Sequence, residues 1–293
     1  MTRFPFTFAA VALAFLAVSP GQVSPAAAKE AAATRIVSIG SAVTETIFAL
    51  GEGDRVVAVD TTSTYPAEAT KLPNVGYMRA LAAEGVLSMQ PDLIVADADS
   101  GPVTTIDALK AAGVRFEGVP LSFDEAGVLQ RIARIGAVLG AKAATDRLTA
   151  TVKARFSALA ELTGRVKTSK RIAFVLSLQS GRPMVAGTGT AADGIIALAG
   201  GVNAFADFEG YKPVADEAVL AAAPDVVLMM NRQGHTIEAD ELFAMPAFRL
   251  VPAAKERSLV RMDGSYLLGF GPRTAEAAHD LALTLYPDLK QGE

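Results

Sequence analysis

The sequence contains no cysteine, no tryptophan and only two histidines among its 293 residues. Without cysteine the chain can form no disulfide, no thiolate metal site and no iron–sulfur cluster, and it cannot carry the lipid-modified cysteine of a lipoprotein. A basic charge excess is also lacking, since 27 lysines and arginines face 31 aspartates and glutamates, for a formal charge of −4. Such a chain has no positive field to attract nucleic acid, so we expect no nucleic-acid partner.

Recognisable enzyme motifs are lacking as well. The sequence has no Walker loop, no Gly-x-Ser-x-Gly elbow, no His-Glu-x-x-His helix and no Cys/His cluster. The two histidines, His235 and His279, have no carboxylate partner at a metal-site spacing. His279 falls in a predicted helix and is interpreted as a surface or structural residue. His235 falls in a predicted loop, where a structural or solvated role is the leading interpretation, and it is the one candidate for a chemical role. We therefore predict that the protein is not an enzyme.

The chain begins with the features of an export signal. Residues 4–18 form an apolar run behind a single cation, Arg3, and lead into the small residues 25–28. This order is typical of a secretory signal peptide, whereas a membrane anchor would need roughly 18 or more apolar residues without the small-residue exit. We predict a signal peptide over residues 1–28, cleaved after Ala28.

A pattern of about a dozen residues occurs twice in the chain. Residues 84–95 comprise a predicted short helix, a Pro-Asp turn and a buried strand, and residues 217–228 repeat that order with glutamate, proline and aspartate at matching positions. Two structurally similar halves explain this agreement most simply. The glutamates that open the two copies, Glu84 and Glu217, are candidates for docking a partner, and stabilisation of the local helix dipole is the alternative interpretation.

Each half also opens with an apolar run, residues 35–39 and residues 171–175, which we predict to be buried strands. The first run leads into a helix that Ser41 is expected to cap, and the second half contains a predicted helix over residues 191–198. Alternating strands and helices predict an α/β fold. We expect two similar Rossmann-like lobes with largely parallel sheets and a ligand cleft between the lobes, where the carboxyl ends of the strands meet.

Residues 142–163 lie between the halves and place apolar residues at helical spacing without an internal proline or glycine. We predict one long helix, which at 1.5 Å per residue spans roughly 30 Å and connects the two lobes. An ordinary amphipathic helix packed on one lobe is the alternative. The predicted domains are an N-terminal α/β lobe over residues 29–141, a connecting helix over residues 142–165 and a C-terminal α/β lobe over residues 166–293.

The loop at residues 73–81 contains the strongest candidate for a ligand site. It carries Tyr77 and, two residues later, Arg79. A phenolate at Tyr77 is suited to a hard ferric ion, and the arginine would stabilise the negative charge on its oxygen. Taken alone, a half-buried tyrosine with a satisfied hydroxyl and a surface arginine explain the same two residues.

Two residues of the second half are placed near this site by the predicted topology. Arg232 follows the repeated strand of the second half, so the duplication places it across the cleft, where a second guanidinium could meet the same anionic group. A solvated loop cation is the alternative. Phe270 lies in a loop shaped by glycines and is a candidate to cover a flat apolar ligand, while an ordinary helix entry explains it equally well.

Together these segments resemble the periplasmic haem-binding proteins of bacterial haem-uptake ABC transporters, within the helical-backbone class of solute-binding proteins. The similarity extends over nearly all of the chain after the signal peptide, and the Gly-Tyr-x-Arg element at residues 76–79 is its specific part. The segments that carry the resemblance are residues 35–51, 75–85, 180–184, 231–232 and 268–274.

The resemblance implies that the protein binds ferric haem, with Tyr77 as the axial ligand of the iron. Arg79 would support the tyrosinate from its own loop, and Arg232 would reach it from the other lobe. Tyrosinate ligation with arginine support favours Fe(III). Side chains such as Met78, Met184 or Phe270 are candidates to cover the face of the haem, and a place in the core explains each of them equally well.

The resemblance also implies a partner, because this class docks on an ABC import permease through one glutamate per lobe, here Glu84 and Glu217. We expect a monomer in the periplasm that is not a lipoprotein. Three alternatives stay open: a ferric-siderophore or corrinoid carrier of the same class, a periplasmic haem enzyme with His235 as its acid–base residue, and an interaction module without a small ligand.

Overall fold

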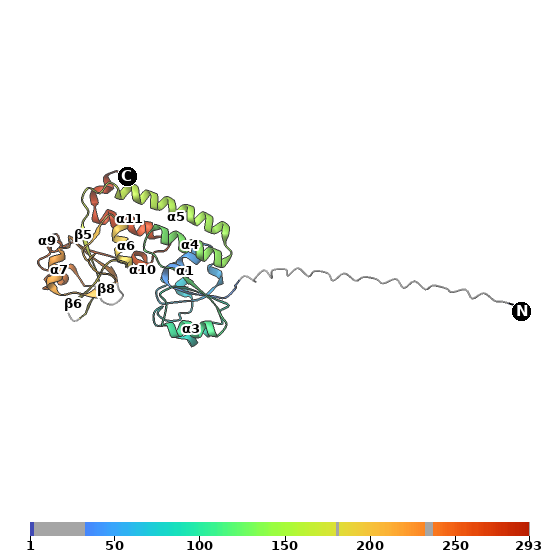
Figure 1. Ribbon diagram of the computed structural model, residues 1–293. Helices are drawn as coiled ribbons and strands as arrows, with labels where there is room; N and C mark the ends of the chain where they lie inside the picture. Colours follow the sequence, from blue (N-terminus) through green and yellow to red (C-terminus); the bar gives the residue numbers. More distant parts are fainter. Residues whose placement is uncertain (3–32, 180–181, 232–236, 293) are drawn as a thin grey trace. The chain divides into compact units, whose positions relative to one another are not determined.

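Two β-sheets form the framework of the protein, and all their strands follow residue 32 (Figure 1). The structure, a computed structural model, describes residues 1–2, 33–179, 182–231 and 237–292. The predicted signal peptide therefore lies outside the described residues except for its first two. Within the described part of the chain, no helix is both long and apolar enough to cross a membrane.

The first sheet contains β1 (Ile36–Ile39), β2 (Val56–Val59), β3 (Leu93–Asp97) and β4 (Arg115–Val119). Its strand order is β2-β1-β3-β4 and every pair is parallel, as predicted. The central strands β1 and β3 consist of buried residues, as expected where helices cover both faces of a parallel sheet. The helices of this first lobe are α1 (Ser41–Ala49), α2 (Ala83–Leu87) and α3 (Val103–Ala111), with 3₁₀ turns at Gly53–Arg55 and Ala69–Lys71.

The second sheet is mixed. It contains β5 (Arg171–Gln179), β6 (Arg182–Ala186), β7 (Val202–Asn203), β8 (Tyr211–Pro213), β9 (Val226–Asn231) and β10 (Leu259–Asp263). Strands β7 and β9 pair parallel with β5, and β10 pairs parallel with β9. Strand β6 pairs antiparallel with β5, and β8 pairs antiparallel with β6. The expectation of parallel strands fails there because only two residues separate β5 from β6, and a parallel crossover needs a dozen or more.

The helices of the second lobe lie between and after its strands, but the alternation is incomplete, because β5 leads directly into β6 and β7 into β8. They are α6 (Ala191–Leu198), α7 (Asp216–Ala222), α8 (Ala239–Ala244), α9 (Pro252–Lys255), α10 (Gly264–Leu268) and α11 (Thr274–Leu285), with a 3₁₀ turn at Pro287–Gly292. Helix α6 has the predicted bounds, and the Thr190 side chain caps it by accepting a hydrogen bond from the Asp193 N–H.

Helix α1 begins differently from the prediction. Ser41 is its first residue rather than its cap, and Gly40 occupies the cap position without a side-chain hydrogen bond. The backbone of Gly40 has φ 108°, and a Cβ atom there would lie 2.2 Å from Oδ2 of Asp97. Only glycine fits this position, so close packing against β3 decides the residue that precedes the helix.

The predicted duplication is visible as a repeated turn before β3 and β9. Asp92 accepts hydrogen bonds from the backbone N–H groups of the two residues before β1, at 2.8 and 3.0 Å. Asp225 accepts one from the first residue of β5, at 2.8 Å. The residue before each Pro-Asp pair is left-handed, with φ 49° at Gln90 and 43° at Ala223. The same turn thus connects β3 to the start of β1 in the first half and β9 to the start of β5 in the second.

The two lobes are connected by a pair of helices, α4 (Glu125–Leu139) and α5 (Lys142–Thr163), which pack against each other (Figure 1). Helix α5 has the bounds predicted from the sequence. Leu148 packs against the core of each lobe, which the alternative of a helix on one lobe does not explain. Helix α4 also reaches both cores, through Ile132 and Ile135.

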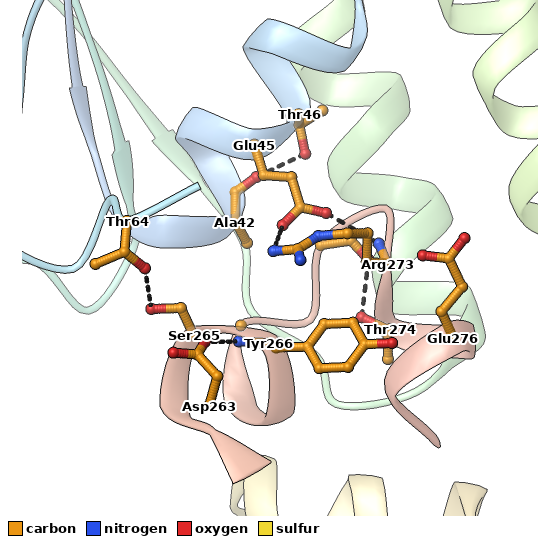
Figure 2. Close-up of polar contacts among 12 residues, drawn as sticks. Ala42, Glu45, Thr46, Thr64, Asp263, Ser265, Tyr266, Arg273, Thr274 and Glu276 are labelled. Atoms are coloured by element: carbon orange, nitrogen blue, oxygen red, sulfur yellow. Dashed lines mark hydrogen bonds and ion pairs between the residues drawn. The ribbon is translucent and has the colours of Figure 1, made fainter. Parts of the chain in front are cut away.

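A polar cluster joins α1 and the loop after β2 to the segment that precedes α11 (Figure 2). Glu45 accepts hydrogen bonds from the backbone N–H and the Nη2 of Arg273, at 3.0 and 2.8 Å. The Arg273 guanidinium lies 3.4 Å from the ring centroid of Tyr65, in a cation–π contact. Thr64 and Ser265 are also joined, with 3.1 Å between their hydroxyl oxygens. These contacts fasten segments more than 200 residues apart.

Candidate functional site

The loop that carries Tyr77 is fastened to the carboxyl end of β2. The Val59 N–H donates to the carbonyl of Pro73, and the Val75 N–H donates to the carbonyl of Val59, both at 2.9 Å. The Thr61 N–H then donates to the carbonyl of Gly76, also at 2.9 Å. The loop therefore lies where ligands bind in parallel α/β sheets.

The loop contains both buried core residues and exposed residues. Met78 and Leu81 are buried in the core of the first lobe, whereas Tyr77 is 43% exposed and Arg79 is also exposed. Gly76 has φ 98°, and its N–H donates to Oδ1 of Asn74 at 2.8 Å. A positive φ favours glycine here, so the turn before Tyr77 depends on this residue.

Tyr77 and Arg79 lie together, as the sequence predicts. Nη1 of Arg79 donates a hydrogen bond to the Tyr77 hydroxyl oxygen at 2.9 Å, and its guanidinium carbon lies 5.9 Å from the Tyr77 ring centroid. Its Nη2 forms a hydrogen-bonded ion pair with Oδ2 of Asp99. Partial burial lowers the pKa of the Arg79 guanidinium, but the bonds to Tyr77 and Asp99 outweigh it and raise that pKa above its ordinary value.

Asp99, the ion-pair partner of Arg79, is not among the residues predicted from the sequence. It lies two residues after β3, so it shares the carboxyl edge of the first sheet with the Tyr77 loop. A rule that indicates Asp99 is that residues shortly after a strand lie at the carboxyl edge of the sheet. In the second half, this rule indicates Arg232, which follows the repeated strand. The same rule applied to β3 leads to Asp99.

The other predicted site residues lie in different parts of the chain and differ in burial. Arg232 and His235 lie outside the described residues. Phe270 is 1% exposed and packs edge to face against Phe123, with 5.2 Å between ring centroids. The structure thus places Phe270 in the core. Met78 is likewise a core residue of the first lobe, and Met184 is half-buried.

Glu84 and Glu217 occupy equivalent places in the two lobes. Each is the second residue of a short helix, α2 or α7, and each is exposed. Neither helix has a side-chain hydrogen bond at its cap. Both carboxylates are therefore presented to solvent at matching positions of the duplication.

A buried ion pair lies beneath the site. Asp97, the last residue of β3, and Arg131 of α4 are almost fully buried, with 3.2 Å between Oδ1 and Nη1. Nη1 of Arg131 also donates to the carbonyl of Gly269 in the second lobe, at 3.3 Å. Burial raises the pKa of the Asp97 carboxyl to about 6, and the negative charge of Asp99 adds to this rise, although Arg131 opposes it.

The raised pKa of Asp97 predicts a specific dependence of stability on pH. The folded state holds this proton up to about pH 6, whereas the unfolded chain releases it near the ordinary pKa of 3.8. Stability from this group is therefore full below pH 3.8 and is lost as the pH rises through 6. Between pH 4 and pH 7, the wild type should lose about 2 kcal/mol more unfolding free energy than Asp97→Asn, as measured by urea unfolding. An equal pH dependence in both proteins would refute the assignment.

Comparisons with known proteins agree with this architecture. A family model described as periplasmic binding protein matches residues 36–266. The solved structure of the periplasmic heme-binding protein RhuT from Roseiflexus sp. RS-1, in apo form, is 39% identical, with a TM-score of 0.81 over 87% of this chain and 98% of that one. The vitamin B12-binding protein of Vibrio cholerae serotype O1 is 30% identical over 96% of this chain and 98% of its own length.

A third relative, from Bacillus subtilis, is an uncharacterized ABC transporter substrate-binding lipoprotein named YvrC, 28% identical over 87% of this chain and 80% of its own length. The resemblance inferred from the sequence is thus confirmed at the level of fold and family. Members of this family are substrate-binding transport proteins and not enzymes, in agreement with the missing catalytic motifs. Because the family model matches well over half of its length, this chain belongs to the periplasmic binding protein family.

Proposed function

We propose that this protein binds ferric haem through the phenolate oxygen of Tyr77 and delivers it to an ABC import permease. The observation that carries the proposal is the 2.9 Å hydrogen bond from the Arg79 guanidinium to the hydroxyl of a 43% exposed tyrosine. Similarity to a heme-binding protein at 39% identity supports the same ligand.

The chemistry of the pair suits an iron ligand that carries negative charge. A guanidinium is charged at every physiological pH, so it can donate a charge-assisted hydrogen bond to a phenol oxygen that binds iron. A phenolate is a hard oxygen donor, and haem proteins with tyrosine ligation hold the ferric state. The half-exposed ring leaves room for a flat ligand to approach the oxygen. We also propose that Arg232 meets the same oxygen from the second lobe, across a cleft between the lobes.

The remaining parts of the proposal concern export and docking. Glu84 and Glu217, both exposed and equivalently placed, would contact the permease. Export to the periplasm is proposed from the signal-like residues 1–28, and we propose that the exported protein acts as a monomer. Although the Bacillus subtilis relative is a lipoprotein, this chain contains no cysteine that could be lipid-modified.

A corrinoid is the second candidate ligand, and a specific observation supports it. The vitamin B12-binding protein of Vibrio cholerae matches this chain over 96% of its length. Its identity to this chain, 30%, is lower than the 39% of the heme-binding protein. The Tyr77 and Arg79 pair favours haem, because it offers an anionic oxygen to a ferric ion.

Thermal unfolding in the presence of three ligands distinguishes these candidates. A ligand that binds only the folded state stabilises it by about 2.7 kcal/mol at a free concentration 100 times its Kd. For a chain of this length we expect ferric haem to raise Tm by about 5–10 °C, and cyanocobalamin and ferrichrome to leave it unchanged. A shift with cyanocobalamin alone would identify a corrinoid carrier. A shift with none of the three would overturn the proposal.

A further inference from the structure

We propose that Asp99 is a positioning residue for haem binding, which holds the Arg79 guanidinium in the orientation that places Nη1 against the Tyr77 oxygen. This inference rests on the proposed function, because Tyr77 is taken as the iron ligand. It adds a residue from a different segment, the turn after β3, to the Tyr77 and Arg79 element.

The need for such a residue follows from the exposure of Arg79. Its side chain is 52% exposed, and an arginine loses about 2 kcal/mol of rotamer entropy when it is held in one conformation. A single hydrogen bond to Tyr77 leaves the guanidinium free to rotate about that bond. Because the group is planar and rigid, a second bond from Nη2 to Asp99 fixes the direction of Nη1.

Asp99 is itself held by the backbone. The Ala98 N–H donates to the carbonyl of Val119 at 2.9 Å, and the Ser100 N–H donates to that of Asp97 at 3.0 Å, so the residues on both sides of Asp99 are bonded to the sheet. The same turn is joined to the Tyr77 loop, because the Gly101 N–H donates to the carbonyl of Met78 at 2.8 Å. The Asp99 carboxylate and the Tyr77 phenol thus lie on two segments that are hydrogen-bonded to each other.

Charge alone would give Asp99 the opposite effect, which makes the proposal testable. A carboxylate near Tyr77 that acted only through its charge would disfavour a phenolate, so its removal would strengthen haem binding. A carboxylate that positions Arg79 strengthens the hydrogen bond to the phenolate, so its removal weakens haem binding. The direction of the change in Asp99→Asn therefore separates the two roles.

The experiment measures the dissociation rate of ferric haem into excess apomyoglobin and the phenolate-to-iron charge-transfer band. We expect Asp99→Asn to dissociate about tenfold faster, as for the loss of one charge-assisted hydrogen bond, and to shift the band. Arg79→Gln should do the same, and the double variant should be no worse than Arg79→Gln alone, because Asp99 acts through Arg79. Asp99→Glu should restore most of the wild-type rate and band position.

A matched control is available on the neighbouring strand. Glu117 of β4 also pairs with exposed arginines, Arg115 at 3.0 Å and Arg134 at 2.6 Å, and Glu117→Gln should leave the rate and the band unchanged. Wild-type or slower dissociation in Asp99→Asn, or additive effects in the double variant, would overturn the inference while the proposed function stands. If the wild type binds no haem, or if Tyr77→Phe keeps the wild-type band, the proposed function itself fails and the inference fails with it.

Discussion

Replacement of Arg131 by methionine is expected to lower the free energy of unfolding by about 3–5 kcal/mol at pH 7.5. The Arg131 side chain is 1% exposed, so it has left water almost completely. Its removal leaves Asp97 as a buried carboxylate without a counterion and also deletes the hydrogen bond to the Gly269 carbonyl. Urea unfolding followed by circular dichroism measures the loss, and the slope of the transition should stay as in the wild type.

The pH and a neighbouring arginine provide the controls. At pH 5 the loss should be smaller, because Asp97, with a pKa of about 6, is then mostly protonated and needs no partner. Arg134→Met, on the exposed side of the same helix, should change the unfolding free energy by about 0.5 kcal/mol or less. A loss below about 1 kcal/mol in Arg131→Met would show that the buried pair contributes little.

The features that the sequence predicts correctly are those that local chemistry dictates. The repeated Pro-Asp turn is one, because in both lobes a left-handed residue, Gln90 or Ala223, leads directly into the Pro-Asp pair. Helix α5 is another, since its residues keep helical spacing without a break. The Tyr77 and Arg79 pair is a third, because the two residues lie only two positions apart on one short loop.

The features that were missed depend on segments far apart in the chain. Asp99 meets Arg79 only because β3 ends beside the Tyr77 loop. Arg131 looks like one more polar residue on an amphipathic helix, yet it pairs with Asp97 in the interior. Phe270 was placed at the mouth of the site from its glycine-rich neighbourhood, but packing against Phe123 buries it. Such contacts follow from the assembled lobes, and of these three residues only Asp99 has a sequence signal, its position shortly after a strand.

Removal of the Tyr77 hydroxyl is expected to have the largest effect on ligand binding. Tyr77→Phe deletes the one oxygen proposed to bind iron and keeps the ring, and it leaves Arg79 and Asp99 in place. Loss of a residue that only supports a metal ligand weakens binding 10–100-fold, so loss of the ligand itself should weaken haem binding by at least about 100-fold. Tyr65→Phe is the matched control, because Tyr65 is 45% exposed and its ring contacts Arg273 instead.

The measurement that tests the central claim most directly is the visible absorption spectrum of the protein titrated with ferric haem, for wild type, Tyr77→Phe and Tyr65→Phe. We expect wild type and Tyr65→Phe to give a saturable, one-to-one spectrum of high-spin ferric haem with a tyrosinate ligand, and Tyr77→Phe to lose it. A Tyr77→Phe protein that binds haem with the wild-type spectrum and affinity would contradict the account.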